Sequence, residues 1–316
     1  MGCKIVVGFK LAQEYQERLH ERFPKLDWIF SRSKHETLSE VRNADAFFGW
    51  PTDQIIAAGK RLRWLHLLGA GADGFNVETA RLRQILVSNN RGVAASNIAE
   101  HVLALMLSFA RDLPALSHAQ QHRRWTKSHE LTLFELSGQT LGIIGLGAIG
   151  QALAKKANAL GMRVLGVRRS SRPVACVAEL YSASQIPDMA SQCHHVVACL
   201  PGTQESNNLI NAKIFGAMRP GSYFYNVGRG ATVHTEHLVE ALDNGILAGA
   251  GLDVVEPEPL PEDHPLWGHP RVIMTSHTAG NTASYWARGI VLFEQNLVAF
   301  LSGEELVTKV DLQRGY

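Results

Sequence analysis

Residues 141–150 read Leu-Gly-Ile-Ile-Gly-Leu-Gly-Ala-Ile-Gly, an apolar stretch that runs directly into the pattern Gly145-x-Gly147-x-x-Gly150. The apolar residues predict a buried strand, and residues 151–160 predict the helix that follows it. In this setting the first glycine allows a sharp turn, the second lets a pyrophosphate approach the backbone, and the third lets the helix pack on the strand. The free N–H groups at the start of the helix attract phosphate. The stretch therefore predicts a dinucleotide-binding site.

The residues after the next predicted strand, 162–167, indicate which dinucleotide is bound. Arg168, Arg169 and Ser170 follow this strand. A carboxylate at this place would hold the adenosine ribose of NAD, whereas two guanidinium groups and a hydroxyl suit a 2′-phosphate. The sequence thus predicts an enzyme that prefers NADP(H) over NAD(H).

Composition restricts the class of protein. A chain of 316 residues with 46% apolar and 19% charged residues is typical of a globular protein with two domains. The net charge of +2, without a long basic run, gives no reason to expect nucleic acid as a partner. The four cysteines form no CxxC pair, which favours reduced thiols over a disulfide frame or a metal site. No signal peptide is recognisable, and the apolar helix predicted at 98–110 is too short to span a bilayer, so we expect a cytoplasmic protein without membrane contact.

Strand and helix patterns alternate along the chain, which predicts an α/β fold with two doubly wound domains. Five strands are expected before residue 90, near 4–9, 26–30, 46–50, 64–68 and 85–88. A helix at 97–111 and six further strands between 139 and 275 match a Rossmann sheet. The long helix at 282–302 is expected to return to the first domain. We therefore expect a Rossmann dinucleotide-binding domain over 93–283, a smaller flavodoxin-like substrate domain over 1–92 and 284–316, and a cleft between them.

Three further motifs stand at the ends of predicted strands. Arg229 lies between glycines, acidic residues follow Asp253, and His277 ends the last strand. An arginine there can grip a carboxylate, a carboxylate can orient a histidine, and a histidine can act as a general acid. Taken singly, a surface arginine, a solvated acidic loop and a structural histidine are the simpler interpretations.

The order of these motifs resembles the D-isomer-specific 2-hydroxyacid dehydrogenase family along nearly the whole chain. The stretch Leu68-Gly-Ala-Gly-Ala-Asp73-Gly resembles the substrate-carboxylate loop of the family, and residues 90–101 resemble its hinge. Residues 260–272 are also characteristic. Within the family the sequence is similar to the glyoxylate/hydroxypyruvate reductase A group, which shares the basic residues after the second strand and a tail ending Arg314-Gly315-Tyr316.

This resemblance implies the NADPH-dependent reduction of a small 2-oxo acid, such as glyoxylate or hydroxypyruvate, to the D-2-hydroxy acid. It implies that Arg229 binds the substrate and that His277 donates the proton. Glu258, five residues after Asp253, would hydrogen-bond to His277. The substrate-binding residues would be Ala70, Gly71, Arg229 and His277.

The resemblance also implies which residues contact the cofactor, and at two places this sequence departs from the pattern of the family. The contacts are Gly145, Gly147, Ala148, Ile149, Gly150, Arg168, Arg169, Ser170, Leu200, Pro201, Val227, Gly228, Asp253 and Gly280, with Asp253 beside the nicotinamide. Ser276 stands where the family usually has proline, and His194 and His195 stand where it tends to have aspartate. Adjacent strand residues face opposite ways, so we interpret these two histidines as structural. The pair His118 and His122 indicates a solvated helix face rather than zinc.

Other interpretations remain open at this point. The same fold could act on phosphoglycerate, formate or phosphite, or serve as a cofactor-sensing binding protein. A homodimer is expected from the resemblance, through residues 97–125. Trp50, Trp125, Trp267 and Trp286 could line the substrate pocket, although each is also a good core or interface residue.

Overall fold

The computed structural model describes residues 2–72 and 76–314. Asp73 of the carboxylate loop and Gly315 and Tyr316 of the tail lie outside the described residues. The chain forms two compact units. Unit 1 contains the described residues up to Val93 and from Ala283 onward, and unit 2 contains Ala94–Thr282.

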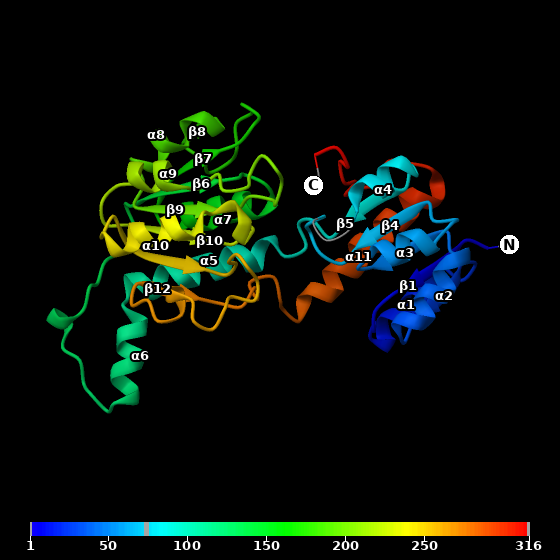
Figure 1. The fold of residues 1–316 in the computed structure, drawn as a ribbon, viewed down its shortest axis with the longest axis horizontal. Coiled ribbons are helices and arrows are strands. Elements are labelled where there is room, and N and C mark those ends of the chain that lie inside the picture. Colours follow the sequence, from blue (N-terminus) through cyan, green and yellow to red (C-terminus); the bar gives the residue numbers. More distant parts are fainter. Residues whose placement is uncertain (1, 73–75, 315–316) are drawn as a thin grey trace. The chain divides into compact units, whose positions relative to one another are not determined.

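Unit 1 is built on five parallel strands in the order β2-β1-β3-β4-β5, the order of flavodoxin-like sheets. Helices cover both faces of this sheet (Figure 1): α1 and α11 pack on one face, and α2, α3 and α4 pack on the other. The strands are β1 (Lys4–Val7), β2 (Asp27–Phe30), β3 (Ala46–Gly49), β4 (Trp64–Leu67) and β5 (Leu86–Asn89). The helices are α1 (Gln13–Arg22), α2 (Lys34–Glu40), α3 (Asp53–Ala58), α4 (Val77–Leu82) and α11 (Ser284–Ser302).

The C-terminal helix α11 is joined to this unit by an aromatic stack and a buried carboxylate. The ring of Phe293 stacks on that of Phe48, with 4.2 Å between the centroids. The next residue, Glu294, has no exposed surface, and its two oxygens each accept a bond of 2.7 Å from Arg18 of α1. Arg22 adds a third bond at 2.5 Å. These contacts fix α11 against α1.

Unit 2 is built on seven parallel strands in the order β12-β11-β10-β9-β6-β7-β8, which contains the Rossmann strand order. Helices α5 and α7 cover one face, and α8, α9 and α10 cover the other. The strands are β6 (Thr140–Ile144), β7 (Arg163–Val167), β8 (Glu179–Tyr181), β9 (His195–Ala198), β10 (Ser222–Asn226), β11 (Leu247–Leu252) and β12 (Val272–Met274). The helices are α5 (Ala95–Ala110), α6 (Leu113–Gln121), α7 (Ala148–Ala159), α8 (Ile186–Ala190), α9 (Ala212–Ala217) and α10 (Thr235–Asp243). The predicted fold class is thereby confirmed.

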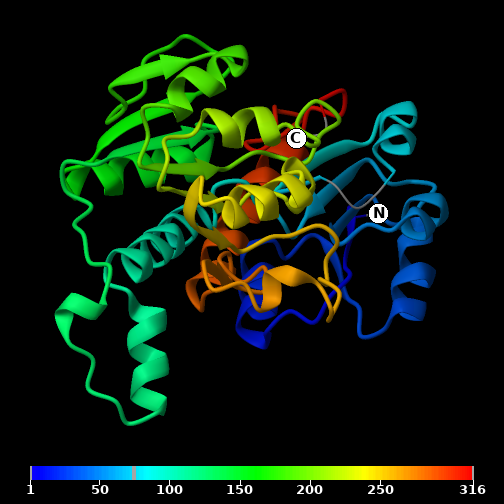
Figure 2. The same ribbon diagram turned by 60° about the vertical axis from the view of Figure 1, so that its left-hand side comes forward.

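Single turns of 3-10 helix lie between these elements, at η1 (Val41–Asn43), η2 (Ser128–Glu130), η3 (Ala183–Gln185), η4 (Gly230–Thr232) and η5 (Pro265–Trp267). In Figures 1 and 2, α6 and the loop after it extend away from the sheet of unit 2. In the part of the chain that the structure describes, no helix combines the length and apolarity needed to cross a membrane.

Two sequence predictions about unit 2 are wrong. The sheet has a seventh strand, β8, whose three residues at the sheet edge are exposed or half-buried and so give no apolar signal. Helix α7 begins at Ala148 rather than at 151, because Gly147 has extended backbone angles and acts as its N-cap. Gly150 therefore lies in the first helical turn, where a Cβ would overlap the Gly145 carbonyl oxygen.

The contact between α1 and α11 generates a test of stability. Glu294→Gln removes the charge from a fully buried acceptor of three arginine bonds. We expect the free energy of unfolding in urea to fall by about 1–3 kcal/mol, the size of a hydrogen bond to a charged group. The exposed Glu17→Gln on α1 is the control, with a change below about 0.5 kcal/mol. Equal effects of the two substitutions would contradict this view of Glu294.

Candidate active site

The candidate site residues of unit 2 follow the strand ends of one parallel sheet. The fingerprint follows β6, Leu200 and Pro201 follow β9, Arg229 follows β10, Asp253 follows β11, and His277 follows β12. All of these strands pair in parallel, so their carboxyl ends lie at one edge of the sheet. The strand order reverses between β6 and β9, and ligands of open α/β sheets bind at such a point.

The loop after β6 approaches the loop after β9 closely. Gly145 has a φ of +103°, and a Cβ there would lie 2.7 Å from the carbonyl oxygen of Cys199. At Gly147, by contrast, a Cβ would meet no described atom within 4 Å. Packing within the described protein therefore does not explain why residue 147 is a glycine. The need to leave room for a pyrophosphate at the start of α7 does explain it. The residues present fit a dinucleotide.

The thiol of Cys199, in the loop after β9, is not a candidate nucleophile. Burial raises the pKa of Cys199 to about 12, so the thiol stays protonated at neutral pH.

The basic residues after β7 lie on an accessible loop. Arg168 and Ser170 are half-buried and Arg169 is exposed. The Arg169 guanidinium pairs with the exposed carboxylate of Glu205, and the Ser170 hydroxyl accepts a bond of 3.3 Å from the backbone N–H of Arg172. Two guanidinium groups and a hydroxyl are thus carried by one short segment, and groups of this kind can bind an anion.

The turn that carries Arg229 is fixed by a buried amide. Asn226, with no exposed surface, accepts a bond of 3.1 Å from the N–H of Gly228 and donates one of 3.0 Å to the carbonyl of Arg229. The next residue, Gly230, passes so close to the segment after β11 that a Cβ would overlap the Val255 carbonyl oxygen. The turn after β10 is therefore locked against the loop that leads to Glu258.

The structure brings His277 and Glu258 together. The Nδ1 atom of His277 lies 2.8 Å from Oε2 of Glu258, and the other carboxylate oxygen accepts a bond of 3.2 Å from the N–H of Val255. Both side chains are partly exposed, with 50% and 38% of their surface accessible. With Nδ1 turned toward the carboxylate, Nε2 on the opposite side of the ring is the atom that can serve a substrate.

Asp253 organises the segment that carries His277. Its carboxylate is 3% exposed and accepts bonds from the Thr275 hydroxyl at 2.6 Å, the Thr278 N–H at 2.9 Å and the Ala279 N–H at 3.1 Å. The N–H of His277 donates to the Asp253 carbonyl at 2.8 Å. The turn 275–279 therefore wraps around this carboxylate.

In unit 1, two asparagines bind the carbonyls of the predicted carboxylate loop. Asn89 donates to the carbonyl of Ala70 at 2.6 Å, and Asn90 donates to that of Leu68 at 2.8 Å. The amide oxygen of Asn90 lies 3.1 Å from His66 Nε2. Burial lowers the pKa of His66 to about 4, so this imidazole is neutral at neutral pH. Ala70 is exposed and Gly71 half-buried.

The remaining histidines singled out in the sequence have contacts within the protein. His195 is buried between Gln139 at 2.7 Å and the Tyr225 hydroxyl at 3.1 Å, and burial lowers its pKa to about 3. His194 faces the other way and accepts a bond of 3.1 Å from the N–H of Thr140.

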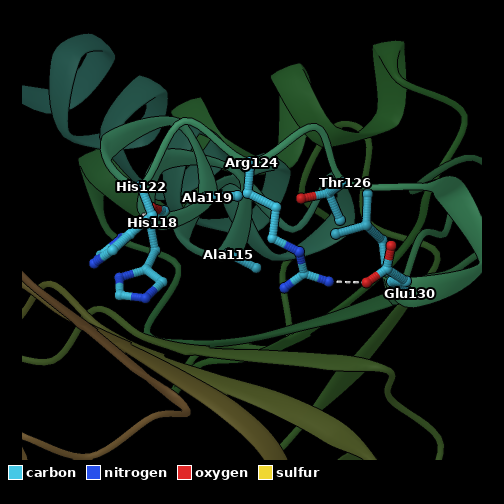
Figure 3. A pocket seen from close by; sticks show the side chains of 8 residues that line it. Ala115, His118, Ala119, His122, Arg124, Thr126 and Glu130 are labelled. Carbon is cyan, nitrogen blue, oxygen red and sulfur yellow. Dashed lines mark hydrogen bonds and ion pairs between the residues drawn. The ribbon is translucent and has the colours of Figure 1, made fainter.

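Helix α6 and the loop after it, residues 113–131, are called the α6 arm. His118 and His122 line an open pocket of about 360 Å³ on this arm, beside the paired Arg124 and Glu130 (Figure 3). The two imidazoles lie next to each other, with ring centroids 4.3 Å apart. Within residues 2–72 and 76–314, no group of three or more His, Cys, Asp or Glu side chains is arranged to hold a metal ion.

Sequence reasoning missed the side chains that support the site. Asn226, Asn97, His101 and Thr275 had no assigned role, yet each holds a loop that carries a candidate residue. The sequence did contain one signal for Asn97 and His101. They stand four residues apart, which places both side chains on the same face of α5.

Known proteins are similar to this chain along most of its sequence. The profile of the family described as "D-isomer specific 2-hydroxyacid dehydrogenase, NAD binding domain" matches residues 103–279. A glyoxylate reductase of Aeropyrum pernix is 35% identical over 282 residues, covering 85% of this chain and 84% of that protein. A glyoxylate/hydroxypyruvate reductase A of Serratia proteamaculans is 30% identical over 314 residues, covering 94% of this chain and 98% of that protein.

A solved structure extends the likeness to the fold. The NADPH-dependent glyoxylate/hydroxypyruvate reductase of Sinorhizobium meliloti, in complex with NADP and sulfate, superposes with a TM-score of 0.86 at 27% identity, covering 99% of this chain and 100% of that chain. The family profile spans more than half of the sequence. The chain belongs to the D-isomer-specific 2-hydroxyacid dehydrogenase family and is an oxidoreductase that acts on CH–OH donors.

Proposed function

We propose that the protein uses NADPH to reduce a small 2-oxo acid to the D-2-hydroxy acid, with glyoxylate and hydroxypyruvate as the first candidates. The observation that carries the proposal is the pairing of His277 Nδ1 with Glu258 at 2.8 Å, on the strand ends next to the Arg229 turn. The names of the relatives from Aeropyrum, Serratia and Sinorhizobium support the choice of substrates.

Each residue has a distinct task in this proposal. Bound NADPH supplies the hydride that C2 of the substrate accepts. Arg229 grips the substrate carboxylate and stabilises the negative charge that develops on the carbonyl oxygen. His277 delivers a proton to that oxygen from Nε2, and Glu258, bonded at Nδ1, holds the imidazole in place. By resemblance to the family, the backbone N–H groups of Ala70 and Gly71 bind the same carboxylate.

We propose the following cofactor contacts from the strand-end positions and from the family resemblance. The pyrophosphate binds at Gly145, Gly147, Ala148, Ile149 and Gly150, and the 2′-phosphate binds at Arg168, Arg169 and Ser170. The remaining contacts are Leu200, Pro201, Val227, Gly228, Asp253 and Gly280. The open space at Gly147 and the basic segment after β7 support this assignment.

A substitution at His277 tests the proton donor. Because this residue has a φ of +52°, His277→Asn removes the donor while keeping a side chain that tolerates the backbone conformation. We expect kcat with glyoxylate and NADPH to fall by about 100- to 10,000-fold, the usual contribution of general acid catalysis. The Kd of NADPH, measured by fluorescence titration, should change less than about twofold, as should both quantities in the exposed Ser276→Ala control. Equal loss of turnover and cofactor binding would make His277 structural.

A charge reversal at Arg168 tests the cofactor preference. Arg168→Asp removes a 2′-phosphate partner and adds repulsion, so we expect the Kd of NADPH to rise by about tenfold or more. The Kd of NADH should change much less, because NADH has no 2′-phosphate. Lys155→Asp on the exposed side of α7 applies the same change of charge as a control. An unchanged ratio of the two dissociation constants in Arg168→Asp would refute the assignment.

We also propose a homodimer that forms through residues 97–125. Trp125 on the α6 arm is 94% exposed, and three leucines in and around this arm are more than one-third exposed: Leu107, Leu113 and Leu133. Large exposed apolar side chains on this part of the chain support a contact surface there. Sedimentation should give the mass of a dimer for the protein and for the control Leu82→Arg, and that of a monomer for Trp125→Arg. A dimer that survives Trp125→Arg would place the contact elsewhere.

The cellular compartment is a further part of the proposal. The four cysteines are free, which supports a reducing, cytoplasmic location.

A further inference from the structure

Helix α5 holds the turn 275–279 at both ends. The side-chain amide of Asn97 donates to the carbonyl of Ala279 at 2.7 Å. One helical turn later, Nε2 of His101 lies 3.0 Å from the hydroxyl oxygen of Thr275. A spacing of four residues places both side chains on the same face of the helix. This face of α5 is thus a support for the segment that carries His277.

The direction of the bond between His101 and Thr275 follows from the protons available. The Thr275 hydroxyl has one proton and donates it to Oδ1 of Asp253, 2.6 Å away, because an ionised carboxylate only accepts. The hydroxyl must then accept from His101, so the imidazole carries its proton on Nε2. The direct distance from His101 Nε2 to Asp253 Oδ1 is 3.7 Å, too long for a hydrogen bond. His101 therefore acts on Asp253 through Thr275.

The turn needs this support because of its backbone. His277 has a φ of +52°, in the left-handed region that an L-residue other than glycine rarely adopts. Such a conformation persists only where neighbouring contacts fix it. Asp253 supplies these contacts by accepting the N–H groups of Thr278 and Ala279.

We propose that His101 is a positioning residue for His277. Its Nε2–H fixes the Thr275 hydroxyl, which fixes the Asp253 carboxylate, which in turn holds the turn with His277 at its apex. This inference rests on the proposed role of His277 as proton donor. Its physical content, the order of the turn, can be measured without any substrate.

The first test is hydrogen exchange of the free protein at the amides of Thr278 and Ala279. His101→Leu removes the donor, and we expect exchange there to become about tenfold faster. His101→Gln keeps an N–H donor and should stay within about twofold of the original protein. Exchange in β6 should not change, which excludes global destabilisation. Glu100→Gln, at the neighbouring exposed residue that pairs with Lys156, is the matched control.

The second test is a double-mutant cycle on turnover. His101→Leu and Thr275→Val should each lower kcat by about tenfold with little change in KM. The double variant should be no slower than the slower single variant, because both substitutions break one chain of contacts.

Three results would overturn the proposal: exchange unchanged in His101→Leu, equal acceleration in His101→Leu and His101→Gln, or additive effects on kcat. Faster exchange in a protein that turns over no 2-oxo acid would support the positioning of the turn and refute the proposed function.

Discussion

The candidate site depends on the hydrogen bonds that the buried carboxylate of Asp253 accepts. A buried ionised group is stable only when its oxygens are satisfied, and Asp253 at 3% exposure is satisfied by Thr275, Thr278 and Ala279. These partners all belong to the turn 275–279, so satisfying the charge also folds the turn. The left-handed backbone of His277 is a consequence of that folding. The position of the proposed proton donor is therefore set by a residue that precedes it by 24 positions in the chain, and α5 supports the same turn from outside.

The turn after the neighbouring strand β10 is held in the same way. The residue proposed to act on the substrate is exposed or half-buried, and a buried polar residue holds its backbone. Asn226 has this task for Arg229. The close passage of Gly230 against Val255 and the bond from Val255 to Glu258 then join the turns after β10 and β11 into one body. Arginine, glutamate and histidine are thus placed by a continuous set of backbone contacts, as catalysis by pre-organised groups requires.

The sequence was sufficient for the parts of the fold that depend on local pattern, and it also named candidate residues that the structure places after strands. The glycines after β6, and Arg229, Glu258 and His277 at strand ends, combine a periodicity with a chemical group within a few residues. The sequence was insufficient to predict contacts between residues that lie far apart along the chain. His101 and Thr275 are 174 residues apart, and the apolar pattern of α5 does not show which of its polar residues meets the last strand. Edge strand β8 was missed because its residues are not buried on either face, and the start of α7 was misplaced because glycine is read as a helix breaker.

The most direct test of the central claim follows the hydride. NADPH carrying two deuterons at C4 of the nicotinamide is incubated with the protein and hydroxypyruvate, and the product is analysed by mass spectrometry and chiral chromatography. Our account predicts D-glycerate with one deuterium at C2, because the cofactor supplies that hydrogen while His277 supplies the exchangeable proton on oxygen. The L-enantiomer, a product without deuterium, or NADPH that remains bound without turnover on hydroxypyruvate and glyoxylate would contradict it.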